Sequence, residues 1–156
     1  MSGKYTVVFS GVAVTAQQDL IAIVAGSSRT LKVLGYGLSQ STEVGDTQEE
    51  GLSILVKSGA TSAGSGGNSY TPVPLDAANG VASAFTSRIN DTTIASGGTI
   101  VTHYPYNWNV RGPFDIILPE PMQIILTAGR RLVMGLATTP ADSITMSGYM
   151  IVEEIG

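Results

Sequence analysis

Short strand-type segments separated by turn signals run along the whole chain, and this pattern constrains the fold more than any other feature. Clusters of Gly, Pro, Asn, Asp and Ser interrupt the apolar segments every 8 to 15 residues. No convincing long helix lies between them, and the alternation of strands with helices that marks βαβ units is absent from the sequence. We therefore expect an all-β domain, an antiparallel sandwich or barrel with eight to ten strands.

The expected strands are recognised by alternating apolar and polar residues or by short apolar runs. They cover 4–14, 31–40, 52–57, 81–89, 99–110, 114–118, 122–126, 131–137 and 144–155. Segment 15–25 is ambiguous, because Thr15 and Gln18 have the spacing of a helix capping box. Its β-branched residues and the Gly-Ser-Ser that ends it favour a strand.

Three strands carry features that predict how they are placed. In the first strand, alternation puts Tyr5, Val7 and Phe9 on one face and Val8, Val12 and Val14 on the other. Gly35 and Gly37 leave one face of their strand bare, which indicates a close approach of another backbone or a bend. Pro105 implies an edge strand or a bulge.

Residues 58–69 form a long loop of Gly, Ser, Ala and Thr, and Pro72 and Pro74 follow soon after. Such a loop on a β scaffold suits a surface arm or a contact loop. Its small side chains cannot form a core of their own. We expect it to be mobile in the free protein and to become ordered against a partner.

The composition limits the function classes. The 156 residues fit one domain, 1–156, and the absence of cysteine excludes disulfides and Cys-ligated zinc. A net charge of −4 with scattered Lys and Arg argues against nucleic-acid binding. No apolar run is long enough to span a bilayer, and the first residues lack the pattern of a secretory leader. We expect synthesis in the cytoplasm and no membrane partner.

Charged residues make up 13% of the chain, about half the usual quarter. Either the surface is rich in Ser, Thr and Gly, or part of it is buried against other chains. Segments 20–24 and 122–126 are apolar on both faces, whereas a strand with one buried face alternates cleanly. These features predict a homo-oligomer.

No residue pattern predicts catalysis or a cofactor. His103 is the only histidine, and no Gly-x-Ser-x-Gly nucleophile motif occurs. The acidic stretch 43–50 could in principle bind Ca²⁺ through Asp46, Glu49 and Glu50, but it lacks the residue order of an EF-hand, which favours a solvated loop. The glycine-rich segment 59–67 has no Gly-Lys-Ser/Thr for a phosphate site. We expect a protein that is not an enzyme.

Two groups of residues are candidates for an interface. The first group has the residue types that anchor interfaces, with core packing as the alternative, and comprises Tyr104, Tyr106, Trp108 and Arg111. The second group lies in the long loop and comprises Ser65, Gly66, Gly67 and Asn68.

The chain as a whole resembles the capsid decoration, or cement, proteins of tailed phages. Four stretches carry the resemblance: the first strand with 15–20, the segment 34–50, the loop 61–67 with 71–75, and the end 140–148 with 152–156. The resemblance is one of pattern, without a catalytic motif. It implies a jelly-roll-like β-sandwich that forms trimers or dimers and clamps neighbouring major capsid subunits on the virion.

Two other functions stay open at this point. The chain could be a receptor- or glycan-binding module of a phage tail fibre or head fibre, with Tyr104, Tyr106 and Trp108 as a stacking platform. An enzyme on a β-sandwich is the less favoured alternative. It stays open because carboxylate pairs that meet only in space leave no signal in the sequence.

Overall fold

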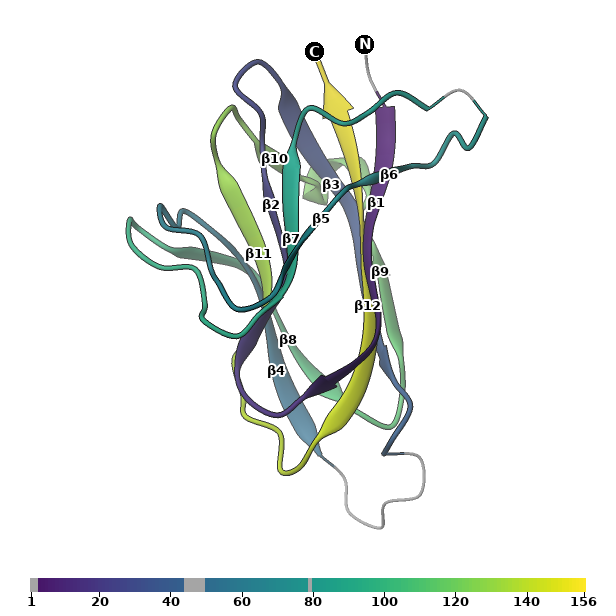
Figure 1. Ribbon diagram of the computed structural model, residues 1–156, viewed down its shortest axis with the longest axis vertical. Coiled ribbons are helices and arrows are strands. Elements are labelled where there is room, and N and C mark those ends of the chain that lie inside the picture. The colour runs from purple at the N-terminus through teal and green to yellow at the C-terminus, as the bar shows by residue number, and fades with distance from the viewer. Residues whose placement is uncertain (1–2, 44–49, 79) are drawn as a thin grey trace.

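The computed structural model describes residues 3–43, 50–78 and 80–156, and these are almost entirely β-structure (Figure 1). The strands are β1 (Gly3–Val14), β2 (Gln18–Val24), β3 (Thr30–Gln40), β4 (Gly51–Ser58), β5 (Asn68–Tyr70), β6 (Val73–Pro74), β7 (Thr86–Asp91), β8 (Val101–Asn109), β9 (Phe114–Ile117), β10 (Ile124–Leu126), β11 (Arg131–Leu136) and β12 (Ile144–Ile155), with one 3-10 turn, η1 (Glu120–Met122). The all-β prediction is confirmed, although the described residues form twelve strands and not the expected eight to ten. No helix in the described ranges has the length and hydropathy needed to cross a bilayer.

Two antiparallel sheets pack face to face (Figure 1). Sheet A has the order β10-β3-β12-β1-β6, with β9 also paired to β3, and sheet B has the order β5-β7-β2-β11-β4-β8. Strands pair from the ends of the chain inward: β1 with β12, β2 with β11, β3 with β9 and β10, and β4 with β8. This is one long hairpin rolled into a sandwich, the order of a jelly roll.

An insertion between β4 and β8 extends both sheets at the same side of the roll. Strand β7 adds to β2, β5 adds to β7, and β6 pairs with β1. The expected strand 81–89 is therefore only partly correct, since β7 begins at Thr86. The residues before it cross the end of the sandwich, where the Ala84 amide donates to the Glu154 carboxylate.

The core lies between the sheets and is formed by the inward residues of both. The side chains of Trp108, Tyr36, Met134 and Met146 are among the largest fully buried ones. Phe114 joins three aromatic rings there, with Tyr36 and Trp108 edge-on to it and Tyr106 tilted against it. Edge-to-face contacts of this kind add to the free energy of burial.

β-Bulges shift the facing of residues in two strands of sheet A. In β1 the register against β12 shifts between Phe9 and Val12, where Gly11 has a φ of 64°. The extra residue turns Val12 and Val14 to the same side as Tyr5, so the expectation that they share a face with Val8 is wrong. A second bulge, at Leu34 in β3, separates that half-buried residue from its inward neighbours.

Other local expectations hold or need adjustment. Segment 15–25 contains strand β2, as its β-branched residues favour. Pro105 lies in β8, which is both an edge strand and bulged, since the register shifts between Val56 and Lys57. The expected strand 122–126 is shorter, because Met122 belongs to η1 after two prolines.

The long loop 58–69 is paired in the free chain, so the expectation of a mobile arm is wrong. It forms isolated bridges with the loop 92–98, at Ser62 with Ser96 and at Ser65 with Thr93. The two loops project together from the side of sheet B (Figure 1). They cover its outer face, where Ala22 and Val133 are buried with Ala95.

Candidate functional site

The outer face of sheet A, called face A below, carries an apolar row that crosses the sheet. The registers place its members side by side on β6, β1, β12, β3 and β9: Val73, Thr6, Ile151, Gly35 and Ile117. Five neighbouring strands span about 19 Å at the usual strand spacing. Face A thus presents a strip whose side chains are apolar apart from one hydroxyl, with exposed residues at its two ends and a buried glycine beside Ile117.

The rows on either side of this strip are mixed. One comprises Val8, Tyr149, Gly37 and Asp115, and the other comprises Lys4, Glu153, Lys32 and Ile125. The charges of the second row alternate in sign along the sheet, so face A as a whole has no strong field of either sign.

Two glycines make face A flat, which is the close approach that their positions predict. A Cβ on Gly37 would lie 2.5 Å from the Tyr149 ring, and one on Gly35 would lie 2.6 Å from the Ile116 carbonyl oxygen. The Tyr149 hydroxyl donates to Asp115 Oδ1 at 2.6 Å. Burial and this hydrogen bond raise the pKa of Tyr149 to about 12, so the phenol is neutral at physiological pH.

Face A contains the most exposed large apolar side chains in the described residues. Ile117 is 68% exposed and Ile125 is 59% exposed. They occupy consecutive outward positions along one edge once the bulge at Leu34 is counted. Contiguous exposed apolar surface of this kind marks interaction sites in soluble proteins.

Sheet B shows by contrast what a covered outer face looks like. Segment 20–24 is apolar on both sides, but its outward residue Ala22 is covered by the paired loops of the same chain. The argument for an oligomer from this segment therefore fails. The same argument from 122–126 stands, because the outward residue Ile125 has no such cover.

The aromatic candidates of β8 are divided between core and surface. Trp108 is 1% exposed, and its Nε1 donates to the Gly112 carbonyl, so it belongs to the core alternative. Tyr106 is 39% exposed and rests on Phe114. Tyr104 is half-buried, with its hydroxyl bonded to the Met122 carbonyl oxygen. Arg111 is exposed beyond the end of the strand.

The loop candidates lie at the contact between the two loops. Ser65 exchanges two backbone hydrogen bonds with Thr93, and the Gly67 amide donates to Asp91. Ser65, Gly66 and Asn68 are exposed, whereas Gly67 is half-buried. The backbone groups of this segment are largely used within the chain, which leaves its side chains for any partner.

His103 sits at the bulge of β8, exposed, with Nε2 2.7 Å from the Ser58 hydroxyl. A nucleophilic serine also needs an acidic group that orients the imidazole. The described residues place no carboxylate in hydrogen-bond contact with this ring.

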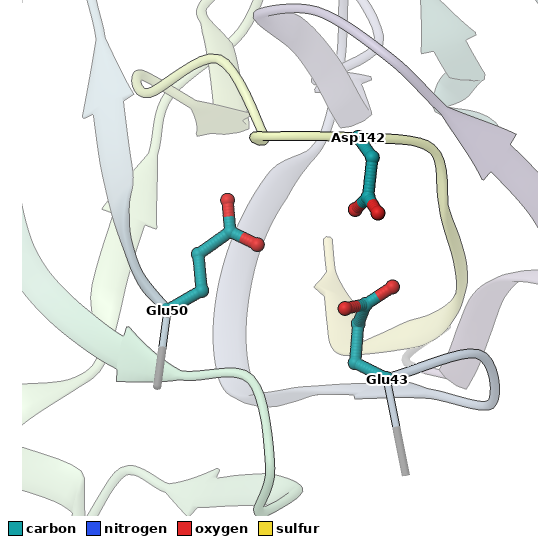
Figure 2. A group of neighbouring side chains, drawn as sticks. All are labelled: Glu43, Glu50 and Asp142. Atoms are coloured by element: carbon teal, nitrogen blue, oxygen red, sulfur yellow. The ribbon is translucent and has the colours of Figure 1, made fainter. Parts of the chain in front are cut away.

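Three carboxylates converge where β3, β4 and the turn before β12 meet: Glu43, Glu50 and Asp142 (Figure 2). Each offers an oxygen within 4.8 Å of the others, and Glu50 also accepts from the Ala141 amide. Ca²⁺ takes roughly six to eight oxygens, so this cluster alone does not complete a site. Of the Ca²⁺ ligands considered from the sequence, Glu50 is in the cluster, and Asp46 and Glu49 lie outside the described residues.

Sequence reasoning missed most of face A, although the two-sided apolar segment 122–126 indicated one part of it. Comparison with known proteins adds no further constraint, because no family model, no curated protein and no solved structure matches this chain.

Proposed function

We propose that this chain is a non-enzymatic structural protein of a phage particle, a decoration protein that binds the major capsid shell as a homo-oligomer. The observation that carries the proposal is the flat apolar row on face A, whose two ends, Val73 and Ile117, are exposed. The low charged fraction of 13% supports it, because few charges are available to solvate the surface. The jelly-roll order is compatible with the sequence resemblance.

The mechanism is linkage. A protein that binds the assembled shell and not free capsid subunits stabilises the shell by its binding free energy. An oligomer, with a trimer favoured, engages several subunits at once, so its attachment gains from effective concentration. Face A joins the copies of the decoration protein, and the loops over sheet B are left for the shell.

The glycan-binding alternative loses the platform on which it rested. It needs the rings of Tyr104, Tyr106 and Trp108 on one exposed surface, but Trp108 is in the core and the Tyr104 hydroxyl is used within the chain. A sugar site would have to lie elsewhere in the molecule.

Co-sedimentation tests the proposal. Shells assembled from the major capsid protein of the same phage are pelleted with the purified chain, and unassembled subunits serve as the control. We expect the chain to pellet with shells, to raise their melting temperature and to ignore free subunits. Absence from the shell pellet, or equal affinity for free subunits, would refute the decoration role.

A further inference from the structure

A pocket lies at the end of the sandwich where β1 begins and β12 ends. Its walls come from the start of β1, the end of β12, the β2–β3 turn and the segment that precedes β7. Its volume is about 340 Å³, at the lower end of the range for small-molecule sites. Its lining includes Tyr5, Arg29, Pro74, Asp76, Val81 and Glu154.

Two almost fully buried side chains have polar atoms to spare at this pocket. Tyr5 is 4% exposed and its hydroxyl makes no hydrogen bond with the described residues, while Glu154 uses only Oε2, which accepts from the Ala84 amide at 2.9 Å. Among the described residues, Asp19 Oδ1 is the side-chain oxygen that is both shielded from solvent and without a hydrogen-bond partner. The Tyr5 hydroxyl and Glu154 Oε1 are therefore open to the pocket they line.

The geometry around Tyr5 is fixed by its neighbours. The Phe85 ring packs edge-on against the Tyr5 ring, with centroids 5.6 Å apart. A Cβ on Gly3 would lie 2.7 Å from the Tyr5 hydroxyl oxygen, so only glycine leaves this space open. Buried polar groups normally have hydrogen-bond partners, but the Tyr5 hydroxyl and Glu154 Oε1 have none among the described residues.

The lining indicates what kind of partner fits. The Lys4 side chain lies on face A, so the charged side chains at the pocket are Arg29, Asp76 and Glu154, and the pocket presents charges of both signs. It offers the Tyr5 hydroxyl and a carboxylate oxygen of Glu154 beside an apolar wall that includes Pro74. Such a set matches a molecule with several hydroxyls on one side and C–H groups on the other.

We propose that this pocket binds a neutral polyhydroxylated ligand the size of a single sugar ring. Tyr5 donates or accepts one hydrogen bond, Glu154 Oε1 accepts a second from a ligand hydroxyl, and the apolar wall packs against the C–H face of the ring. Burial and the nearby Glu154 raise the pKa of Tyr5, so its hydroxyl keeps its proton at neutral pH. The site goes beyond the proposed decoration role and does not depend on it.

The test is a titration of the ¹⁵N-labelled full chain, followed by NMR. The probes are glucose, galactose, mannose and rhamnose, with glucuronate and glucosamine as charged counterparts. Concentrations reach about 50 mM, well above the roughly millimolar Kd expected for a few hydrogen bonds. We expect saturable shifts at the amides of Gly3, Val81 and Ala84 with at least one neutral sugar. No saturable shift with any neutral sugar, or tighter binding of a charged probe, would overturn the proposal.

Variants locate the binding. Tyr5→Phe keeps the ring and removes the hydroxyl, so the affinity should fall about tenfold, the loss expected for one hydrogen bond. Ala82→Phe places a ring at the exposed rim without touching the core and should block entry. Tyr106→Phe, at the far edge of the sandwich, is the matched control and should bind as before. Unchanged affinity in both pocket variants would place the site elsewhere. Sedimentation of the same variants shows whether they still self-associate, so a loss of sugar binding can be distinguished from a loss of the oligomer.

Discussion

At the scale of single residues, the least expected buried side chain is Asp19, which lies beneath the loop 92–98 on sheet B. It is 2% exposed on β2, and its Oδ2 accepts from the Ala95 amide at 2.6 Å. Burial raises the pKa of this carboxyl above its ordinary value of 3.8, and the Ala95 hydrogen bond opposes the shift. The carboxylate therefore ties the loop 92–98 to sheet B at the cost of a buried charge.

This position predicts a pH-dependent effect of Asp19→Asn. A folded-state pKa above the unfolded value contributes stability that is full below pH 3.8 and is lost as the pH rises through the folded value. Asn keeps an oxygen for Ala95 and has no charge to bury. We expect Asn to raise the free energy of unfolding on the order of 1 kcal/mol at pH 7 relative to the wild type, with a smaller gain near pH 4. Urea unfolding followed by the fluorescence of the single tryptophan measures both.

Asp19→Ala separates the charge from the hydrogen bond. It removes the charge too, but leaves the Ala95 amide without an acceptor, which costs about 1–3 kcal/mol. An Asn variant that loses as much stability as the Ala variant, or that gains equally at both pH values, would show that the buried charge is not the cause.

The same scale explains why the sequence could not divide the aromatic candidates on β8 between core and surface. Residue type alone cannot distinguish an anchor of the core from an anchor of an interface, because both are large and aromatic. Trp108 and Tyr106 are two residues apart and so face the same way, yet one is buried and the other partly exposed. Both rings pack on Phe114, but only Trp108 also donates to the Gly112 carbonyl in the turn after β8, and no local pattern encodes these contacts.

At the scale of elements, the paired loops 58–69 and 92–98 belong to the folded domain. Gly64 is buried between them, and a Cβ there would lie 2.6 Å from the Thr93 carbonyl oxygen. We expect Gly64→Ala to lower the free energy of unfolding by about 1–3 kcal/mol, the usual cost of overpacking. Gly112→Ala is the control, because a Cβ there meets nothing within 4 Å. Equal unfolding midpoints for the two variants would mean that the loops are not packed together.

The elements also show what a sequence pattern can and cannot supply. Strands such as β1, β3 and β12 were predictable because alternation over many residues reports a half-buried surface. The bulge in β1 was not predictable, since one extra residue shifts the phase without changing the composition. The cover over β2 was missed for a related reason: Ala22 is outward but buried by loops that lie far away in the sequence.

At the scale of the whole molecule, the jelly roll places both ends of the chain in the centre of sheet A and leaves face A uncovered. Its pairings join distant segments, such as β1 with β12, so the strand order could not be derived from local signals. The insertion β5–β7 adds strands at one side and the loops cover sheet B, but neither covers Ile117 or Ile125. Self-association through face A would bury both.

Self-association through face A predicts that substitutions on this face lower the sedimenting mass of the chain. We expect the wild-type chain to sediment as an oligomer, with a trimer favoured, at micromolar concentration. Ile117→Lys combined with Ile125→Lys should give monomers, because removing two ammonium groups from water costs far more free energy than the apolar contacts contribute. High salt should leave the wild-type oligomer intact, since burial of apolar area is not screened as ion pairs are.

Ile94→Lys combined with Ile100→Lys is the matched control. Both residues are exposed isoleucines outside face A, on the side of the loops. This variant should keep the wild-type mass, whereas a general loss of surface hydrophobicity would dissociate both pairs alike. A wild-type chain that stays monomeric up to high micromolar concentration would remove face A as the self-association surface. Dissociation by the control pair alone would move that surface to the loops over sheet B.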